Sequence, residues 1–435
     1  MGGTWHDARV TTTRDASAPA KNSSTVRLTL RKPLERSIRA GHPWIYRDAL
    51  ALPTASRDLR DRKSGLKSPA IGGARSSGPS TGSAVDIIGA NGHFVARGLY
   101  DSTSPIAVRI ATLDPQQALD EALVRARVRS ALRARRGAFD AHTTDAFRWL
   151  NGEGDFLPGV VVDVYGPVAI LRLDGDAVRA WRDWVVSAVV DDGRALGITH
   201  VYERSRGGRG RALHGGAPPS PVEIRENGVR FAVDVVHGQK TGFFLDQREN
   251  RRAIRPFCSD VEVVNLFGYT GGFSVHAALA GARRVTTVDV AAAALDDARA
   301  NFALNGLDPA RHAFDAEDAF DWLDRARGEG RRYGVVITDP PSFAPSEKVL
   351  QKALGAYRDL HTRALQLVEE GGILAAASCS SHVTMDAFVG TLRDAAEKAC
   401  RPLRLLELRG QPADHPTPPV FAEGRYLKFV LARAD

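Results

Sequence analysis

Cys379 is the residue of this sequence best placed for covalent chemistry. It lies in the run Ser-Cys-Ser-Ser-His at 378–382, directly after a predicted apolar strand at 373–377. A cysteine in such a place is either an inert, small apolar side chain or, as a thiolate, a nucleophile. Nucleophilic catalysis replaces one difficult step by two easier ones, so a thiolate here could activate a poorly reactive substrate. The other cysteines, Cys258 and Cys400, are predicted to be packing residues.

Asp339 is a second candidate for chemistry, because it ends another predicted strand, 333–338. It is followed by Pro340, Pro341 and, after one serine, Phe343. Two prolines cannot continue a strand ladder, so the chain must leave the sheet at its carboxyl edge, where open α/β sheets bind ligands. In that position the carboxylate could hydrogen-bond a ring nitrogen or an amino group, and the aromatic ring could stack on a planar base.

A glycine-rich turn and an acidic strand end predict a nucleoside-bearing cofactor. The β-branched run at 261–266 predicts a buried parallel strand, and a turn that contains Gly268 and Gly271 leads from it into a helix. Glycines let the backbone approach a ligand closely, and the helix N-terminus offers free N–H groups. The next strand, 284–288, ends on Asp289, whose carboxylate could accept both hydroxyls of a ribose. The turn does not match the dinucleotide pattern G-x-G-x-x-G, so a cofactor without phosphates is favoured.

These side chains can share one site only if their strands are neighbours in a single sheet. Predicted strands and helices alternate along 261–377, including a long helical pattern at 353–370, and this alternation indicates an α/β fold with a largely parallel sheet. The carboxyl ends of such strands lie at one edge, so the strand-end carboxylates and the thiol are expected to face the same crevice. The tail, 403–409 and 425–432, predicts a final antiparallel hairpin.

The turn N-L-F-G-Y-T-G-G-F at 265–273 resembles the S-adenosylmethionine turn of class I methyltransferases, and D-P-P-S-F at 339–343 resembles a motif of methyltransferases that act on planar bases. The resemblance implies an α/β fold with a Rossmann-like seven-stranded sheet and S-adenosylmethionine as the cofactor. In this class an acidic residue in the region 313–323 commonly accepts the adenine amino group. Asp318 aligns with that residue, and the alternatives that stay open are Asp315, Glu317 and Asp321.

A third stretch, at 237–252, mixes adjacent phenylalanines with charged and amide side chains, as expected of a lid that packs on an adenine and orients ligand and RNA phosphate. Its sequence G-Q-K-T-G-F-F-L-D-Q-R-E-N-R closely resembles the segment before the cofactor turn in the family of large-subunit ribosomal RNA cytosine-carbon-5 methyltransferases. L-P-G-V-V-V-D at 157–163 and S-C-S around Cys379 resemble the same family. The predicted cofactor-binding residues are Phe243, Asp246, Gln247, Arg248, Asn265, Phe267, Gly268, Gly271, Asp289, Asp318 and Asp339. The predicted substrate-binding residues are Arg251, Pro340, Pro341 and Phe343.

This resemblance implies transfer of a methyl group from S-adenosylmethionine to carbon 5 of a cytidine in large-subunit ribosomal RNA. Carbon 5 of cytosine is a poor nucleophile, and attack of a thiolate on carbon 6 turns the ring into an enamine that can take the methyl group. Cys379 is the predicted nucleophile, and Asp339 is predicted to stabilise the base at its N3 and amino edge. A base must also remove the carbon-5 proton. That acceptor stays open, although His382 is near in sequence.

Two other functions stay open at the level of sequence. One is a methyltransferase of another RNA base position, in which Cys379 is a bystander. The other is a non-catalytic RNA-binding or assembly factor that keeps the fold and has lost methyl transfer. Replacing Cys379 by alanine would separate the first from the covalent mechanism, and a complete lack of transfer to bulk RNA would support the second.

The N-terminal part of the chain carries the whole excess of positive charge. Residues 1–112 contain 17 Lys and Arg against 8 Asp and Glu, whereas the rest of the chain is close to neutral. A local basic region favours a polyanionic partner, and nucleic acid is favoured over a membrane because no basic amphipathic helix stands out. The run G-H-P-W-I-Y at 41–46 and the hairpin pattern at 85–100 resemble a PUA-type RNA-binding module, which implies a small β-barrel.

With 435 residues the chain predicts several domains. They are a disordered leader at 1–24, a PUA-like domain at 25–112 with a flexible insertion at 55–83, a linker helix and small α+β domain at 113–236, and a methyltransferase domain at 237–435. Three cysteines make neither a disulfide framework nor a Cys-x-x-Cys metal site, so a reduced, cytoplasmic protein without a metal is expected. No apolar run is long enough for a bilayer. The oligomeric state stays open, with a homodimer among the possibilities.

Overall fold

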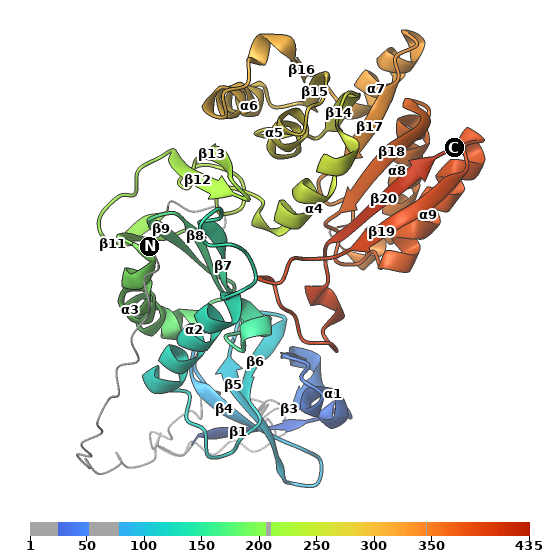
Figure 1. The fold of residues 1–435 in the computed structure, drawn as a ribbon. Coiled ribbons are helices and arrows are strands. Elements are labelled where there is room, and N and C mark those ends of the chain that lie inside the picture. Colours follow the sequence, from blue (N-terminus) through green and yellow to red (C-terminus); the bar gives the residue numbers. More distant parts are fainter. Residues whose placement is uncertain (1–24, 52–77, 206–209, 345) are drawn as a thin grey trace, which may run out of the picture.

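The computed structural model describes residues 25–51, 78–205, 210–344 and 346–435 (Figure 1). The predicted leader and the part of the predicted insertion at 55–77 lie outside the described residues. The described strands form four sheets, of six, five, two and seven strands. No helix in these ranges is both long enough and apolar enough to cross a membrane.

The N-terminal sheet is the small β-barrel that the sequence predicts. Its six strands follow the order β2-β6-β5-β4-β1-β3, and their inward residues, such as Leu28, Val85 and Val108, are buried. The hairpin between β4 and β5 turns at Gly92, whose φ of +80° suits a residue without a Cβ. The elements are β1 Val26–Leu30, α1 Glu35–Arg39, β2 Trp44–Tyr46, β3 Leu50–Ala51, β4 Ala84–Ile88, β5 Phe94–Tyr100 and β6 Ile106–Thr112.

A central five-stranded sheet, in the order β11-β10-β9-β8-β7, packs against two helices. Helix α2 begins after Asp120, whose side chain accepts a hydrogen bond from the Leu123 N–H at 2.9 Å and so caps the helix. Trp149 and Trp181 fill the core between sheet and helices. The elements are α2 Glu121–Arg135, β7 Ala146–Asn151, β8 Val160–Tyr165, β9 Val168–Leu173, α3 Arg182–Gly193, β10 His200–Glu203 and β11 Arg211–His214.

The C-terminal half forms the predicted seven-stranded α/β sheet, in the order β16-β15-β14-β17-β18-β20-β19. Six of these strands run in the same direction, and β20 enters antiparallel between β18 and β19, as the tail pattern predicts. The elements are α4 Arg248–Ala253, β14 Glu262–Leu266, α5 Gly272–Leu279, β15 Arg284–Asp289, α6 Ala292–Leu304, β16 Ala313–Ala316, α7 Ala319–Gly328, β17 Tyr333–Thr338, α8 Leu350–Leu365, β18 Val368–Ser378, α9 Met385–Ala399, β19 Leu403–Arg409 and β20 Lys428–Ala434.

One helix boundary differs from the prediction. The helical pattern at 353–370 ends earlier, because α8 stops at Leu365 and β18 already begins at Val368. The strand pairs Val368 with Tyr333 and then shifts register before Ile373, and Gly371 in that irregular stretch has a φ of +73°. The two glycines therefore accommodate a distortion inside the strand and do not end the helix.

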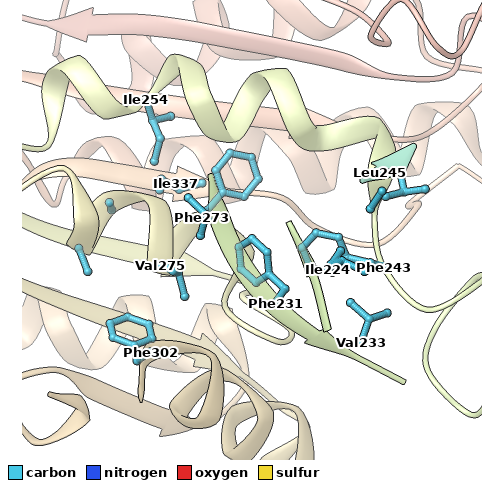
Figure 2. Close-up of a cluster of buried hydrophobic side chains, with 14 of the residues drawn as sticks. Ile224, Phe231, Val233, Phe243, Leu245, Ile254, Phe273, Val275, Phe302 and Ile337 are labelled. Atoms are coloured by element: carbon cyan, nitrogen blue, oxygen red, sulfur yellow. The ribbon is translucent and has the colours of Figure 1, made fainter. Parts of the chain in front are cut away.

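A small hairpin, β12 (Val222–Glu226) with β13 (Val229–Val233), joins the central unit to the seven-stranded sheet. Figure 2 shows Ile224 and Phe231 of this hairpin among Phe273, Val275 and Phe302 of the helices that follow β14 and β15. The shared apolar cluster fixes the segment that follows the hairpin, residues 234–247, over the carboxyl end of the sheet.

The connection between β19 and β20 reaches from the sheet to the N-terminal barrel. The Phe421 ring lies 4.6 Å from the ring of Trp44 in β2, centroid to centroid. Asn151 at the end of β7 donates to the Pro416 carbonyl at 2.7 Å. Residues 410–427, which lead directly into β20 of the seven-stranded sheet, therefore contact both the six-stranded and the five-stranded sheet (Figure 1).

Candidate active site

A cavity of about 570 Å³ opens at the carboxyl ends of β14, β15, β17 and β18. Both predicted catalytic residues, Cys379 and Asp339, line it, as the sheet topology predicts for strand ends. Eleven further predicted site residues line the same cavity: Phe243, Asp246, Gln247, Arg251, Phe267, Gly268, Asp289, Asp318, Pro340, Pro341 and Phe343.

The turn after β14 is held tightly against β15. Its residues Phe267 and Tyr269 have positive φ angles of 60° and 47°, which are strained for side chains that carry a Cβ. A Cβ added to Gly268 would lie 2.4 Å from the Thr287 side chain, so only glycine allows this approach. Asp289 accepts hydrogen bonds from the N–H groups of Tyr269 and Ala291, both at 2.9 Å. Its carboxylate therefore fixes the turn and keeps lone pairs for a ligand.

The structure separates the four acidic residues that compete for the adenine. Asp318 lines the cavity and caps α7, where its carboxylate accepts from the Phe320 N–H at 2.8 Å. Glu317 also lines the cavity, but Arg325 donates to it at 2.6 Å. Asp315 accepts instead from the Trp322 indole at 2.7 Å and, like Asp321, is not part of the lining.

Asp246 lies in the predicted lid, residues 237–252, which we call the lid segment, and it is ionised there. One of its oxygens, Oδ2, accepts from Lys240 Nζ at 2.9 Å and from the Tyr426 hydroxyl at 2.7 Å. Burial opposes its ionisation, but the charge of Lys240 and these hydrogen bonds outweigh that effect and hold the pKa of Asp246 well below its usual range. The other oxygen, Oδ1, is buried and has no hydrogen-bond partner among the described residues. It is therefore an acceptor available to a ligand.

Asp339 lies in a contrasting environment. Its Oδ2 accepts from Gln247 Nε2 at 2.9 Å, and Asn250 in turn donates to the Gln247 carbonyl oxygen at 2.6 Å. Burial and the negative charge of Asp246 raise the pKa of Asp339 to about 6. Two neighbouring carboxyl groups whose pKa values are driven apart suit an acid and a permanent anion.

Cys379 follows the last residue of β18 and is half-buried, with its Sγ 4.0 Å from the Pro340 carbonyl oxygen. The serines on both sides hold it in place: the Ser378 hydroxyl donates to the Tyr357 hydroxyl at 2.8 Å, and the Ser380 hydroxyl lies 3.0 Å from the same oxygen. Burial and the charge of Asp339 raise the pKa of the thiol.

The other cysteines lie elsewhere: the prediction of a packing residue is confirmed for Cys258 and is wrong for Cys400, which the helix end leaves exposed. Cys258 is fully buried in the core beside the seven-stranded sheet, and Cys400 is exposed at the C-terminal cap of α9. His382, the histidine nearest to Cys379 in sequence, is exposed and does not line the cavity.

Three predicted cofactor-binding residues do not line the cavity. Arg248 is fully buried and donates to both carboxylate oxygens of Asp414, at 3.0 and 2.9 Å. Asn265 donates to the Ser274 hydroxyl at 2.9 Å, under the turn. A Cβ on Gly271 would lie 3.0 Å from that of Ala298, so this glycine allows α6 to pack against the start of α5. All three support the cavity from outside it.

Arg251 lines the cavity, and its guanidinium forms an ion pair with Glu226 inside the protein. It is 2 % exposed, and its guanidinium donates to Glu226 at 2.7 and 2.5 Å and to the Phe244 carbonyl. Burial opposes ionisation of Glu226, yet Arg251 and His276 outweigh it and lower its pKa to about 2. Nε and Nη2 are therefore held inside the protein, and the contact of Arg251 with the substrate stays a prediction.

Sequence reasoning missed three side chains of this site: Lys240, Tyr426 and Lys428. Lys240 lies between Gly238 and Gly242 in the predicted lid at 237–252, and its positive charge six positions before Asp246 is a signal that the sequence contains. Tyr426 and Lys428 come from the far end of the chain and join the site only because β20 inserts beside β18. Among the described residues, no group of three or more His, Cys, Asp or Glu could hold a metal ion.

The sequence is similar to known protein families and to individual proteins. Residues 171–427 match the family model described as S-adenosylmethionine-dependent methyltransferase, and residues 28–113 match the PUA-like domain. A Shewanella denitrificans protein named ribosomal RNA large subunit methyltransferase I is 36% identical, over 94% of this chain and 99% of its own length. The protein of the same name from Klebsiella pneumoniae is also 36% identical, over 94% of this chain and 98% of its own.

The fold also has close counterparts among solved structures. The methyltransferase SMU.776, determined as a complex with SAH, superposes with a TM-score of 0.79 over 94% of this chain and 100% of its own, at 24% identity. A Streptococcus mutans protein described as a SAM-dependent methyltransferase gives the same TM-score and coverage at 23% identity. At these identities the likeness concerns the fold.

Proposed function

Since this chain belongs to the family of S-adenosylmethionine-dependent methyltransferases and carries an N-terminal PUA-like domain, we propose that it methylates carbon 5 of a cytidine in large-subunit ribosomal RNA. Its cofactor is S-adenosylmethionine, as the sequence predicts. Relatives of nearly the same length are named ribosomal RNA large subunit methyltransferases, which supports this substrate class. The observation that carries the choice of cytosine carbon 5 is the thiol of Cys379 in one cavity with the carboxyl group of Asp339.

The residues of the cavity fit this cofactor. Asp289 has lone pairs left for ribose hydroxyls, and Asp318 lies at the cavity for the adenine amino group. Asp246 Oδ1, buried and without a partner in the described chain, suits the ammonium group of the methionine part. When bound, S-adenosylmethionine supplies an electrophilic methyl group on a positively charged sulfur.

The first chemical step of the proposal belongs to Cys379 and Asp339. The thiol loses its proton, and the thiolate forms a bond to carbon 6 of the cytosine. The electron pair of the 5,6 double bond moves through the ring while N3 takes a proton, which leaves carbon 5 electron-rich. Asp339 Oδ2 already accepts from Gln247, so Oδ1 is the oxygen that can carry this proton. A pKa of about 6 for Asp339 keeps the acid form accessible near neutral pH.

The second step restores both residues. After carbon 5 has gained the methyl group, a base removes its remaining proton. The electrons of that C–H bond reform the 5,6 double bond and expel the thiolate of Cys379, and N3 returns its proton to Asp339. The products are a 5-methylcytidine, a demethylated cofactor and one proton. Pro340 and Pro341 stiffen the rim, and Phe343 is the ring on which a flipped-out base would stack.

The N-terminal barrel is the part proposed to hold the RNA. Its arginines Arg27, Arg31, Arg36 and Arg39 are exposed, in a region with an excess of positive charge. Such charges neutralise phosphates without reading sequence and release counterions, so binding should weaken steeply with salt. The contacts of Phe421 with His42 and Trp44 connect this barrel to the segment that leads into β20 at the active site.

The test of the proposed function is to identify the product. Protein is incubated with methyl-labelled S-adenosylmethionine and unmodified large-subunit RNA, and the labelled nucleoside is identified after digestion. Label in 5-methylcytidine is the expected result. Label in any other nucleoside would replace the proposed position by another, and cofactor binding without any transfer would indicate an RNA-binding factor.

The covalent mechanism needs a separate experiment. RNA with 5-fluorocytidine in place of cytidine has no carbon-5 proton to remove, so the adduct cannot break down. We expect a protein–RNA complex that survives denaturing electrophoresis, with the cross-link mapped to Cys379. The Cys400→Ala variant is the matched control and should form the same complex, because Cys400 is exposed at the end of α9.

A further inference from the structure

Lys428 is a buried lysine that contacts the residues on both sides of Cys379. It is the first residue of β20, is 3 % exposed, and pairs in register with Ser378 of β18. Its ammonium group donates to the carbonyl oxygen of Ser380 and, at 2.7 Å, to that of Tyr426. One residue before Cys379 and one residue after it are thus both bound by Lys428.

No carboxylate of the described residues lies within ion-pairing distance of Lys428. A buried ammonium group without a counter-ion is unfavourable, because burial removes the hydration of its charge. Lys240 at the same cavity differs, since Asp246 neutralises it at 2.9 Å. Among the described residues, the negative charge that stabilises the ammonium form of Lys428 is the thiolate of Cys379.

The charged and titratable groups that face Cys379 come from four other parts of the chain. Asp339 follows β17, Lys240 and Asp246 belong to the lid segment, Lys428 begins β20, and the Tyr357 hydroxyl lies on α8. Burial and the two carboxylates raise the pKa of the thiol, and the two lysines lower it. Because Lys240 is paired with Asp246, Lys428 is the lysine whose charge remains for the thiol.

We propose that Lys428 is a positioning residue for the nucleophile: its ammonium group stabilises the thiolate of Cys379 and, through the Ser380 carbonyl, fixes the turn that carries it. The proposal rests on the proposed nucleophilic role of Cys379. In the step concerned, the S–H bond breaks, its electron pair stays on sulfur and the proton leaves to solvent through the open cavity. Lys428 itself forms and breaks no covalent bond. Burial lowers the pKa of Lys428 to about 8, and the negative charge of an ionised Cys379 opposes that shift.

The experiment measures the ionisation of the thiol without methyl transfer. Full-length protein is alkylated with iodoacetamide between pH 6 and 10, and modification of Cys379 is followed by peptide mass spectrometry. Lys428→Gln keeps donors for the two carbonyls and loses the charge. We expect its alkylation profile to move up by about one pH unit, so that the rate at pH 7.5 falls about tenfold. Lys428→Arg keeps the charge and should react like the wild type.

The control is Lys352→Gln, the same change at an exposed residue of α8, which should leave the profile in place. An unchanged profile in a folded Lys428→Gln variant, judged by thermal unfolding and S-adenosylhomocysteine binding, would overturn the proposal. If the Gln variant does not fold, the Arg variant decides, because a slower Cys379 in the presence of a permanent charge would contradict it equally. Failure of the proposed function would appear elsewhere, as methyl transfer that persists in Cys379→Ala.

Discussion

The two sides of the cavity are built by different means. The cofactor side consists of Phe267, Gly268, Asp289 and Asp318, which follow neighbouring strands within about 50 residues of chain. Backbone groups hold it: Asp289 accepts from the N–H groups of Tyr269 and Ala291, and Asp318 caps α7. Its geometry is therefore a local consequence of the sheet.

The transfer side consists of Asp339, Cys379, Tyr426 and Lys428, which come from three separate segments, and Asp246, the proposed partner of the cofactor ammonium group, adjoins it from a fourth. Buried charges hold it, and each alters the protonation of the others: the pKa of Asp246 is lowered, whereas burial and Asp246 raise that of Asp339 to about 6. The cofactor side should therefore respond to mutation through affinity, and the transfer side through protonation and rate. The predictions below test this separation.

Cys379→Ala should have the largest effect. Loss of the nucleophile is expected to reduce methyl transfer by at least about 10³-fold, or about 4 kcal/mol in the barrier. The affinity for S-adenosylhomocysteine should stay within twofold of wild type, because the cofactor side does not depend on the thiol. Single-turnover transfer and calorimetry measure the two quantities. Cys400→Ala is the matched control, and transfer by Cys379→Ala within tenfold of wild type would remove the covalent mechanism.

Arg248→Ala should have the next largest effect, on stability. Arg248 and Asp414 are both 0 % exposed, and removal of the arginine leaves a buried carboxylate without its charge partner. Such changes cost about 3–5 kcal/mol. Burial opposes ionisation of Asp414, but His415 and Arg248 outweigh it and hold its pKa below the usual range in the folded protein. The stabilisation is thus present above the unfolded pKa and is lost as the pH falls through the folded pKa.

Urea unfolding at neutral and at acidic pH measures this loss. The matched control is Arg327→Ala, whose partner Asp324 is 3.5 Å away and where both side chains are about half exposed, so the change should stay within about 1 kcal/mol. Equal losses for the two variants would contradict the view that buried charges hold residues 410–427, and with them Tyr426 and Lys428, at the transfer side.

Asp289→Ala should weaken the cofactor and spare the thiol. A lost hydrogen bond to a charged group is worth about 1.5–3 kcal/mol, so the dissociation constant for S-adenosylhomocysteine should rise about 10- to 150-fold. The alkylation rate of Cys379 should not change, because Asp289 lies on the other side of the cavity. Asp318→Ala offers a graded comparison, since that carboxylate also caps a helix. A changed Cys379 profile in Asp289→Ala would show that the two sides are coupled.

The same division explains what could be predicted from sequence. Gly268 and Asp289 were predictable because a strand, its turn and the next strand end are consecutive and have a fixed chemistry. Asp339 and Cys379 were predictable as strand ends of one parallel sheet. Lys428 was not, because it approaches Cys379 through an antiparallel strand that begins 49 positions later, and no periodicity encodes that pairing.

The ion-pair partners of buried arginines were the second feature that could not be predicted from the sequence. Arg248 and Arg251 stand in a stretch typical of ligand binding, yet Arg248 is paired with Asp414, 166 residues away, and Arg251 with Glu226. The sequence indicates that such arginines form ion pairs, but only the folded structure shows whether the partner is a ligand or a carboxylate of the protein. The shortened helix α8 has a similar origin, because the register of β18 against β17 decides where the strand begins.

Asp339→Asn should have the smallest effect at alkaline pH and a clear effect on the pH profile. The active wild-type form needs a protonated Asp339 and an ionised Cys379. This form carries one proton, whereas the fully protonated pair carries two. Because the pKa of Asp339 is about 6 and that of the thiol is higher, wild-type kcat/KM should rise up to about pH 6 and then level off. In Asp339→Asn only the thiol titrates, so kcat/KM should keep rising about tenfold per pH unit up to the thiol pKa. The Asn amide donates a hydrogen bond but no proton to N3, and its larger thiolate fraction near pH 9 offsets much of that loss, so the deficit there should be below tenfold, or about 1.4 kcal/mol. Profiles from pH 5.5 to 9, with S-adenosylhomocysteine affinity as control, test this, and a plateau above pH 6 in Asp339→Asn would assign that ionisation to another group.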